Sequence, residues 1–318
     1  MTTHAPRFRT ALGTAVLAIT VLASCGEGSA PTTKQASPVS DTRTSAAPAP
    51  SQDEVSKRLA ELEKAHGARI GAYAVDTGTG RFLSYRGEER FPFASTGKAM
   101  TCGAVLKKAR TSDPGLMDRV IRYGKGDLVE HSPVTEKHVG TGMTVAELCE
   151  AAITVSDNTA ENLVLEQTGG PKGLTAFLRS VGDPVSRSDR TEPSLNDWRP
   201  GELRDTTTPR PWAQDLRALS LGGALAPADS ERLNGWLKAS TTGDARIRAG
   251  LPKSWTVGDK TGSAGVYGNT NDIAVAWPPA GGPVVITVLL TKPDAAAEPD
   301  EKAVAETARI LSSGLRGS

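Results

Sequence analysis

The sequence has almost no excess of either charge, because its 318 residues include 37 lysines and arginines against 36 aspartates and glutamates. The formal net charge is +1, and no basic stripe or acidic tail interrupts the mixture. Nucleic-acid-binding domains concentrate lysine and arginine on one face or along one element. The charge balance therefore gives no support to a nucleic-acid partner, and we predict none.

Histidine and cysteine are scarce as well, with four and three residues. Nowhere are histidine, aspartate and cysteine spaced as the ligands of a zinc site would be. The sequence therefore argues against a zinc hydrolase, and we expect neither a metal nor another cofactor.

The apolar stretch at residues 11–23 is short, with thirteen apolar or small residues, too few to span a bilayer comfortably. Arg7 and Arg9 precede it, and no acidic residue occurs before Glu27. This order is typical of a secretory signal, so we expect residues 1–24 to direct export. Residues 25–50 contain almost no large apolar side chains, and we expect a disordered tether there.

The signal ends in LASC at residues 22–25, which resembles the lipobox of bacterial lipoproteins. The resemblance implies that Cys25 becomes a lipidated N-terminus on the outer face of the cytoplasmic membrane. The alternative is an ordinary cleavage site, after which the protein would be secreted. We expect a monomer whose only membrane contact is this lipid.

The rest of the chain, residues 51–318, mixes two periodicities. Strand-like patterns occupy residues 68–87, around the turn signal DTGTG, and residues 254–262, 271–277 and 283–291. Helical patterns, punctuated by glycine and proline, occupy residues 51–67, 96–110, 144–155, 159–167, 172–180, 209–219, 229–239 and 300–313.

Two early strands and three late ones can pair into one five-stranded antiparallel sheet flanked by the terminal helices. We therefore predict an α/β (α+β) fold with a sheet lobe, residues 51–88 and 245–318, and an all-helical lobe, residues 89–244. A ligand site is expected in the cleft between the lobes.

Three short motifs could carry chemistry. In FASTGKAM, Ser95 and Lys98 lie three residues apart, so a helix would place a hydroxyl beside an amine. SDN at residues 156–158 lies between two helical segments, and KTG at residues 260–262 ends a strand. Each motif alone has an ordinary explanation, since serine and aspartate cap helices and a polar tripeptide can end a strand. Together, in this order, they are the set found in penicillin-recognising serine enzymes.

Over residues 51–314 the sequence resembles the class A serine β-lactamases. DRTEPSLND at residues 189–197 adds the Ω-loop pattern of this family through Arg190, Glu192, Leu195 and Asn196, and Asp205 follows where the loop-closing ion pair requires it. The resemblance implies hydrolysis of penicillins and cephalosporins through a serine acyl-enzyme, and hence β-lactam resistance. A penicillin-binding DD-peptidase and a non-hydrolysing β-lactam sensor are alternatives, but Glu192 and Asn196 argue against both.

The resemblance also implies how acylation proceeds. Ser95 attacks the β-lactam, and its proton passes to Lys98 or, through a water, to Glu192. Lys98 can act as a base only where burial or a neighbouring cation such as Lys260 disfavours its charged form. The backbone N–H groups of Ser95 and Ser263 would stabilise the oxyanion.

Further roles follow from the same resemblance. Ser156 would relay a proton to the departing ring nitrogen, and Asn158 would orient Lys98 and the substrate's side-chain amide. Glu192 and Asn196 would hold and activate the water that hydrolyses the acyl-enzyme.

The substrate carboxylate needs a cationic anchor, which Lys260, Thr261 and Ser263 supply in part. Since the strand at residues 271–277 has no arginine, Arg246 is the expected anchor, and Arg248 is the second candidate. The alternative for Arg246 is a solvated helix charge.

Cys102 and Cys149 each lie seven residues, about two helical turns, from an active-site serine. Some members of the family join these positions by a disulfide, which would brace the two helices; the alternative is two buried thiols. Two departures from the family pattern leave the substrate range open. His131 replaces an aromatic residue at the cleft mouth, and KTGSAGVYG is one residue longer than the commonest form.

Overall fold

The computed structural model describes residues 50–316. The expected signal, Cys25 and the tether up to residue 49 lie outside the described residues. Within residues 50–316, no helix is long and apolar enough to cross a membrane.

Five strands form one antiparallel sheet in the order β2-β1-β9-β8-β7, which confirms the predicted sheet. The strands are β1 (Arg69–Asp76), β2 (Phe82–Tyr85), β7 (Thr256–Gly262), β8 (Asn271–Trp277) and β9 (Val284–Thr291). The central strand β9 pairs with β1 along its whole length, so an early segment and a late segment of the described chain lie side by side in the sheet. Strand β7 lies at one edge, and this edge becomes one wall of the site.

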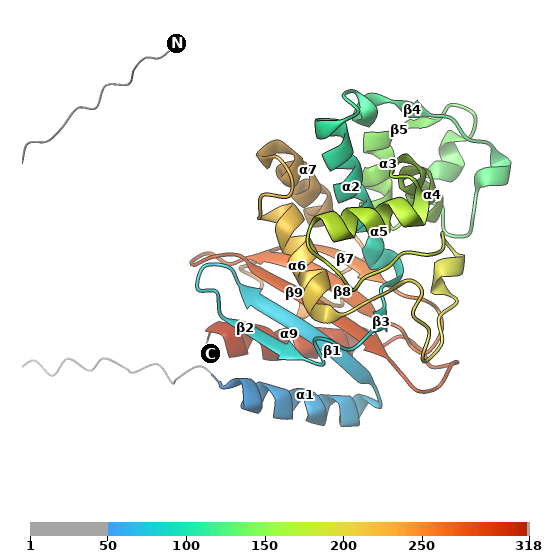
Figure 1. Cartoon of the computed structure of the whole chain (residues 1–318). Helices are drawn as coiled ribbons and strands as arrows, with labels where there is room; N and C mark the ends of the chain where they lie inside the picture. Colours follow the sequence, from blue (N-terminus) through green and yellow to red (C-terminus); the bar gives the residue numbers. More distant parts are fainter. Residues whose placement is uncertain (1–49, 317–318) are drawn as a thin grey trace, which may run out of the picture. The chain divides into compact units, whose positions relative to one another are not determined.

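The sheet is buried on both faces, which explains why β9 is apolar at nearly every position. Successive side chains of β1 point to opposite faces. Ile70 and Ala72 pack under α1 (Gln52–His66) and α9 (Glu301–Arg316), whereas Tyr73 and Val75 pack against the helical lobe. Figure 1 shows α1 and α9 on one side of the sheet and the other long helices on the opposite side.

The helical lobe is built around a central helix that is buried on every side. The lobe contains α2 (Gly97–Thr111), α3 (Val145–Thr154), α4 (Asn158–Gln167), α5 (Gly170–Ser180), α6 (Pro209–Ser220) and α7 (Pro227–Lys238). Every residue of α2 from Gly97 to Leu106 is buried, because small residues such as Gly103 let neighbouring side chains approach closely. The helix that follows Ser95 is therefore fixed by packing along two turns and more.

Local capping accounts for the starts of three helices. Ser51 and Thr144 each form a capping box, with Glu54 and Glu147 respectively, and the Asp157 side chain accepts the N–H of Ala160. The short helix α8 (Ile247–Gly250) joins the lobes beside β7. The exact residues at which one lobe passes to the other stay a prediction.

Several short elements were not predicted, because two to four residues are too few to show a periodicity. These are β3 (Phe91–Pro92), β4 (Val120–Ile121), β5 (Met143–Thr144), β6 (Thr206–Thr207), η1 (Ala94–Thr96), η2 (Leu116–Asp118), η3 (Lys125–Asp127), η4 (Thr135–His138) and η5 (Ser194–Asn196). Strand β3 pairs with β6 and β4 with β5, so each pair joins segments distant in sequence.

Candidate active site

A cavity of about 710 Å³ lies between the two lobes and collects most of the predicted site residues. Its lining includes Ser95, Ser156, Asn158, Asn196, Arg246, Thr261 and Ser263, with His131 at the exposed rim. Lys98, Glu192 and Lys260 are buried directly behind this lining. A larger cavity of about 870 Å³ lies near the end of α1 and the start of β1, but none of the predicted residues lines it. We therefore identify the smaller cavity as the candidate active site from its lining residues and not from its volume.

The turn that carries Ser95 is held from several directions. Ser95 lies in η1 after Ala94, whose φ of +46° is unusual for a residue with a side chain. Phe93 stacks on Trp212 with ring centroids 5.3 Å apart, and Trp212 Nε1 donates to Thr96 Oγ1 at 2.9 Å. Both contacts are buried, so the nucleophile candidate has a rigid support.

Gly262 brings the edge strand β7 against this turn. A Cβ atom at this position would lie 2.9 Å from the carbonyl oxygen of Phe93 and 3.1 Å from the amide nitrogen of Ser95. These atoms are backbone and cannot move aside, so only glycine fits. The close approach places Ser263, the next residue, at the same end of the cavity as Ser95.

Lys98 is at the centre of a buried polar cluster. Its Nζ donates to the carbonyl oxygen of Ser156 at 2.7 Å, to Ser156 Oγ at 3.2 Å and to Asn158 Oδ1 at 2.5 Å. It also lies 3.3 Å from Glu192 Oε1. The Ser95 hydroxyl donates to that same carboxylate oxygen at 2.9 Å. Glu192 is therefore within direct reach of the proton that the nucleophile must lose.

Lys260 approaches the cluster from β7. Its Nζ donates to Ser156 Oγ at 3.0 Å and to the carbonyl oxygen of Thr261 at 2.8 Å. Burial, and next the positive charge of Lys98, lowers the pKa of Lys260 to about 7. Ser156 has a φ of +62°, and its hydroxyl lies within hydrogen-bond distance of both ammonium groups. This arrangement can move a proton between the lysines and a group in the cavity.

Arg246 is not a solvated helix charge, since it is 8% exposed. Its guanidinium donates to Ser263 Oγ at 2.9 Å, to the carbonyl oxygens of Gly262 and Asn271 at 3.0 and 2.8 Å, and to Glu301 at 3.2 Å. Arg248, the second candidate, instead pairs with the buried carboxylate of Asp259. Of the two arginines, only Arg246 lines the cavity.

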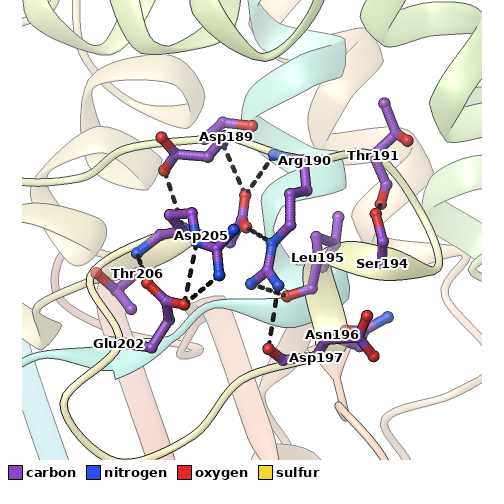
Figure 2. A network of polar contacts seen from close by, with 12 residues as sticks. Asp189, Arg190, Thr191, Ser194, Leu195, Asn196, Asp197, Glu202, Asp205 and Thr206 are labelled. Atoms are coloured by element: carbon purple, nitrogen blue, oxygen red, sulfur yellow. Dashed lines mark hydrogen bonds and ion pairs between the residues drawn. The ribbon is translucent and has the colours of Figure 1, made fainter.

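The segment that carries Glu192 is closed on itself by Arg190 and Asp205 (Figure 2). The Asp205 carboxylate is buried and accepts Arg190 Nε at 2.6 Å and the backbone N–H groups of Asp189 and Arg190 at 2.8 and 3.0 Å. The Arg190 guanidinium also donates to the carbonyl oxygen of Asp197 at 3.0 Å. Both ends of the loop are therefore joined through one partly buried ion pair.

Glu192 is positioned through its backbone as well as its side chain. Asn196 Nδ2 donates to Glu192 Oε2 at 2.7 Å. The Asn162 side chain, which the sequence reasoning missed, accepts the Glu192 N–H and donates to its carbonyl oxygen, both at 2.9 Å. Because Asn162 lies four residues after Asn158 on α4, the shared helix face was a signal that could have found it.

Cys102 and Cys149 are both buried and have free thiols in the structure, with Cys102 Sγ 3.7 Å from the carbonyl oxygen of Cys149. This is the alternative state of two buried thiols, and the predicted disulfide is not formed here; in an oxidising compartment it stays a prediction. Burial, and next the contact with Cys149, raises the pKa of the Cys102 thiol. No group of side chains within residues 50–316 is arranged to hold a metal ion.

The chain is similar to known proteins in sequence and in fold. The model of the beta-lactamase enzyme family matches residues 54–315. Beta-lactamase AST-1 of Nocardia asteroides is 52% identical over 301 residues, which cover 95% of this chain and 93% of that protein.

Solved structures are similar in fold as well. The beta-lactamase of Streptosporangium roseum is 56% identical, with a TM-score of 0.81, and the match covers 82% of this chain and 97% of that one. A mutant of the class A beta-lactamase of the last common ancestor of Gram-negative bacteria is 56% identical, with a TM-score of 0.77, over 81% and 97% of the two chains.

Proposed function

The chain belongs to the class A serine β-lactamases and hydrolyses β-lactams, and from this premise we propose that Ser95 is the acylated residue and Glu192 the base that frees it. Hydrolysis of this kind confers resistance to β-lactam antibiotics. The observation that carries the assignment is the shared carboxylate oxygen, Glu192 Oε1, which lies 2.9 Å from Ser95 Oγ and 3.3 Å from Lys98 Nζ.

In the first step, Ser95 Oγ bonds to the β-lactam carbonyl carbon as its proton leaves. The direct hydrogen bond favours Glu192 as the immediate acceptor, with Lys98 stabilising the charges that form. The carbonyl oxygen becomes an oxyanion, and the N–H groups of Ser95 and Ser263 are assigned to it. The ring C–N bond then breaks, and its nitrogen takes a proton from Ser156, which Lys98 or Lys260 resupplies. The proton held by Glu192 passes to Lys98, 3.3 Å away, so Glu192 is again a carboxylate before the second step.

In the second step, a water attacks the ester that Ser95 has formed. Glu192 removes a proton from this water, and Asn196, bonded to the other carboxylate oxygen, orients both groups. The ester C–O bond breaks and Ser95 Oγ recovers its proton. By resemblance, a DD-peptidase lacks the Ω-loop glutamate, and a sensor holds its ligand without turnover. The Glu192–Asn196 contact therefore supports the hydrolase over both.

The decisive experiment is repeated turnover by the purified wild-type protein. We expect a chromogenic cephalosporin in large molar excess to be consumed completely, because Glu192 lies where it can activate water against the ester. A rapid burst equal to the enzyme concentration, followed by no further change in absorbance, would instead identify a sensor. Steady-state rates on a small panel of penicillins, cephalosporins and carbapenems would then define the substrate range.

Arg246 is proposed to bind the substrate carboxylate together with Lys260, Thr261 and Ser263. Replacing Arg246 with alanine should raise KM about 10- to 100-fold, since a charge-assisted hydrogen bond contributes about 1.5–3 kcal/mol. We expect kcat to change less, because the anchor holds substrate and transition state alike. Arg248→Ala provides the comparison for losing a nearby cation outside the cavity, and a larger KM effect there would contradict the assignment to Arg246.

We infer that the protein is exported, from the signal pattern of residues 1–24, and propose that Cys25 is lipidated. Intact mass of protein recovered from the producing cells tests this proposal together with the Cys102–Cys149 bridge. We expect the mass of a lipid on Cys25, and an unmodified Cys25 would refute lipidation. We also expect the loss of two thiol hydrogens, and two thiols that can be alkylated would refute the disulfide. We further propose a monomer without a nucleic-acid partner.

A further inference from the structure

Helices α2 and α4 make two parallel polar contacts, and only the first belongs to the site described above. Lys98 and Thr101 lie three residues apart on α2, and Asn158 and Glu161 lie three apart on α4. Lys98 Nζ donates to Asn158 Oδ1 at 2.5 Å, and Thr101 Oγ1 donates to Glu161 Oε1 at 2.7 Å. The second contact therefore repeats the first, one helical turn further from the cavity.

Glu161 is an unusual residue for this place. It is 4% exposed, and its Oε2 has no hydrogen-bond partner among the described residues. A carboxylate with an unpaired buried oxygen is unfavourable, and protonation relieves it. Burial raises the pKa of Glu161 to about 7, although the Thr101 hydroxyl and the charge of Lys98 oppose the rise. The side chain is thus poised to exchange a proton near neutral pH.

Titratable groups face Glu161 from every neighbouring part of the site. Lys98 and Cys102 approach from α2, Lys260 from β7 and Glu192 from the loop, while Cys149 of α3 lies beyond Cys102. The two lysines favour the anionic form of Glu161, and Glu192 opposes it. Such a coupling is reciprocal, so an anionic Glu161 favours the protonated form of Lys260 by the same amount.

We propose that Glu161 is a positioning residue of the active site, which aligns α4 with α2 through Thr101 and, once ionised, helps Lys260 to keep its proton. The alignment matters because Asn158 must meet Lys98 one turn away. The charge matters because Lys260 binds the substrate carboxylate only while it is protonated. The proposal rests on the proposed function, in which these lysines serve catalysis and substrate binding.

Glu161→Gln separates the two roles, because glutamine can still accept the Thr101 hydrogen bond but cannot ionise. We expect kcat/KM at about pH 6 to stay within about threefold of wild type. The alkaline limb of the pH profile should move down by roughly half to one pH unit, since Lys260 loses a neighbouring negative charge. Glu161→Ala should lose the contact as well, with a lower Tm and a lower kcat at every pH. Glu150→Gln, an exposed carboxyl on α3, is the matched control and should leave the profile unchanged.

An alkaline limb of Glu161→Gln that superimposes on wild type, or moves upward, would overturn the proposal and leave Glu161 a purely structural residue. Infrared spectroscopy gives a readout that needs no activity. The carbonyl stretch of protonated Glu161 should be present at about pH 6 in wild type and disappear by about pH 8. Glu161→Gln should lack this titrating band at every pH. Burial, and next the neighbouring Asp183, raises the pKa of Asp215 to about 9, so its own band persists over this range.

The infrared measurement also tests the proposal in two further cases, a variant that does not fold and a wild-type protein that shows no turnover. If Glu161→Gln does not fold, absence of the titrating band from the wild-type spectrum overturns the proposal. A wild-type protein that fails to turn over a chromogenic cephalosporin would overturn the proposed function, whereas the band would still report on the ionisation of Glu161.

Discussion

Replacing Ser95 with alanine should abolish both hydrolysis and covalent labelling by a β-lactam. Among the described residues, Ser95 has the only hydroxyl group that donates a hydrogen bond to the Glu192 carboxylate. We expect turnover of a chromogenic cephalosporin to fall by about 10⁴-fold or more, the size of effect seen when a serine nucleophile is removed. Intact mass after incubation should show unmodified protein.

Ser112→Ala is the control for this substitution, because Ser112 is exposed beyond the far end of α2. The control should react and label like wild type. A mass increase of Ser95→Ala equal to one β-lactam would show that another residue is acylated and would remove the assignment of Ser95.

Replacing Glu192 with glutamine should turn a hydrolase into a protein that reacts once. The substitution preserves volume beside Asn196 and Ser95 but removes the base that activates water. Steady-state turnover should fall by about 10²- to 10⁴-fold, the usual contribution of a general base. Stopped-flow absorbance should show a burst of one equivalent that is slower than in wild type, because Lys98 must then accept the Ser95 proton in place of Glu192. Intact mass should show the acyl-enzyme persisting.

Two other outcomes would each contradict a part of the assignment. Unaltered turnover by Glu192→Gln would remove Glu192 from deacylation. Loss of both the burst and the adduct, in a variant whose Tm matches wild type, would show that Glu192 is also indispensable for activating Ser95 and that Lys98 cannot replace it. Glu150→Gln again controls for the loss of a carboxylate elsewhere.

Much of the fold could be predicted from the sequence because its elements have strong local boundaries. The first helix was expected at residues 51–67 and runs from Gln52 to His66, with Ser51 as its N-cap and Gly67, in the left-handed conformation, as its C-cap. The last three strands were expected within two residues of where they lie, since turn residues flank apolar runs.

The remaining features depend on contacts between distant segments, and local patterns do not contain them. Glu161 in NTAENLV has the appearance of an ordinary helix acid, and only the packing of α2 against α4 buries it. Its spacing of three from Asn158 placed it on the face that meets Lys98, which was the available signal. The partners of Arg246 belong to β7, β8 and α9, so the sequence could nominate the arginine but not its bonds.

The partly buried Arg190–Asp205 pair also bears on how much antibiotic resistance each copy of the protein can provide. It closes the loop that carries Glu192, while Ser95, Lys98 and β7 are held by other contacts. We expect that loss of this ion pair would still allow an antibiotic molecule to acylate Ser95 but would prevent hydrolysis of the acyl-enzyme. Each copy would then neutralise one molecule and no more, as growth assays at graded expression would reveal. The amount of antibiotic destroyed would then be limited by the number of protein copies made and would no longer grow with time. One ion pair therefore decides whether the protein acts catalytically or only stoichiometrically.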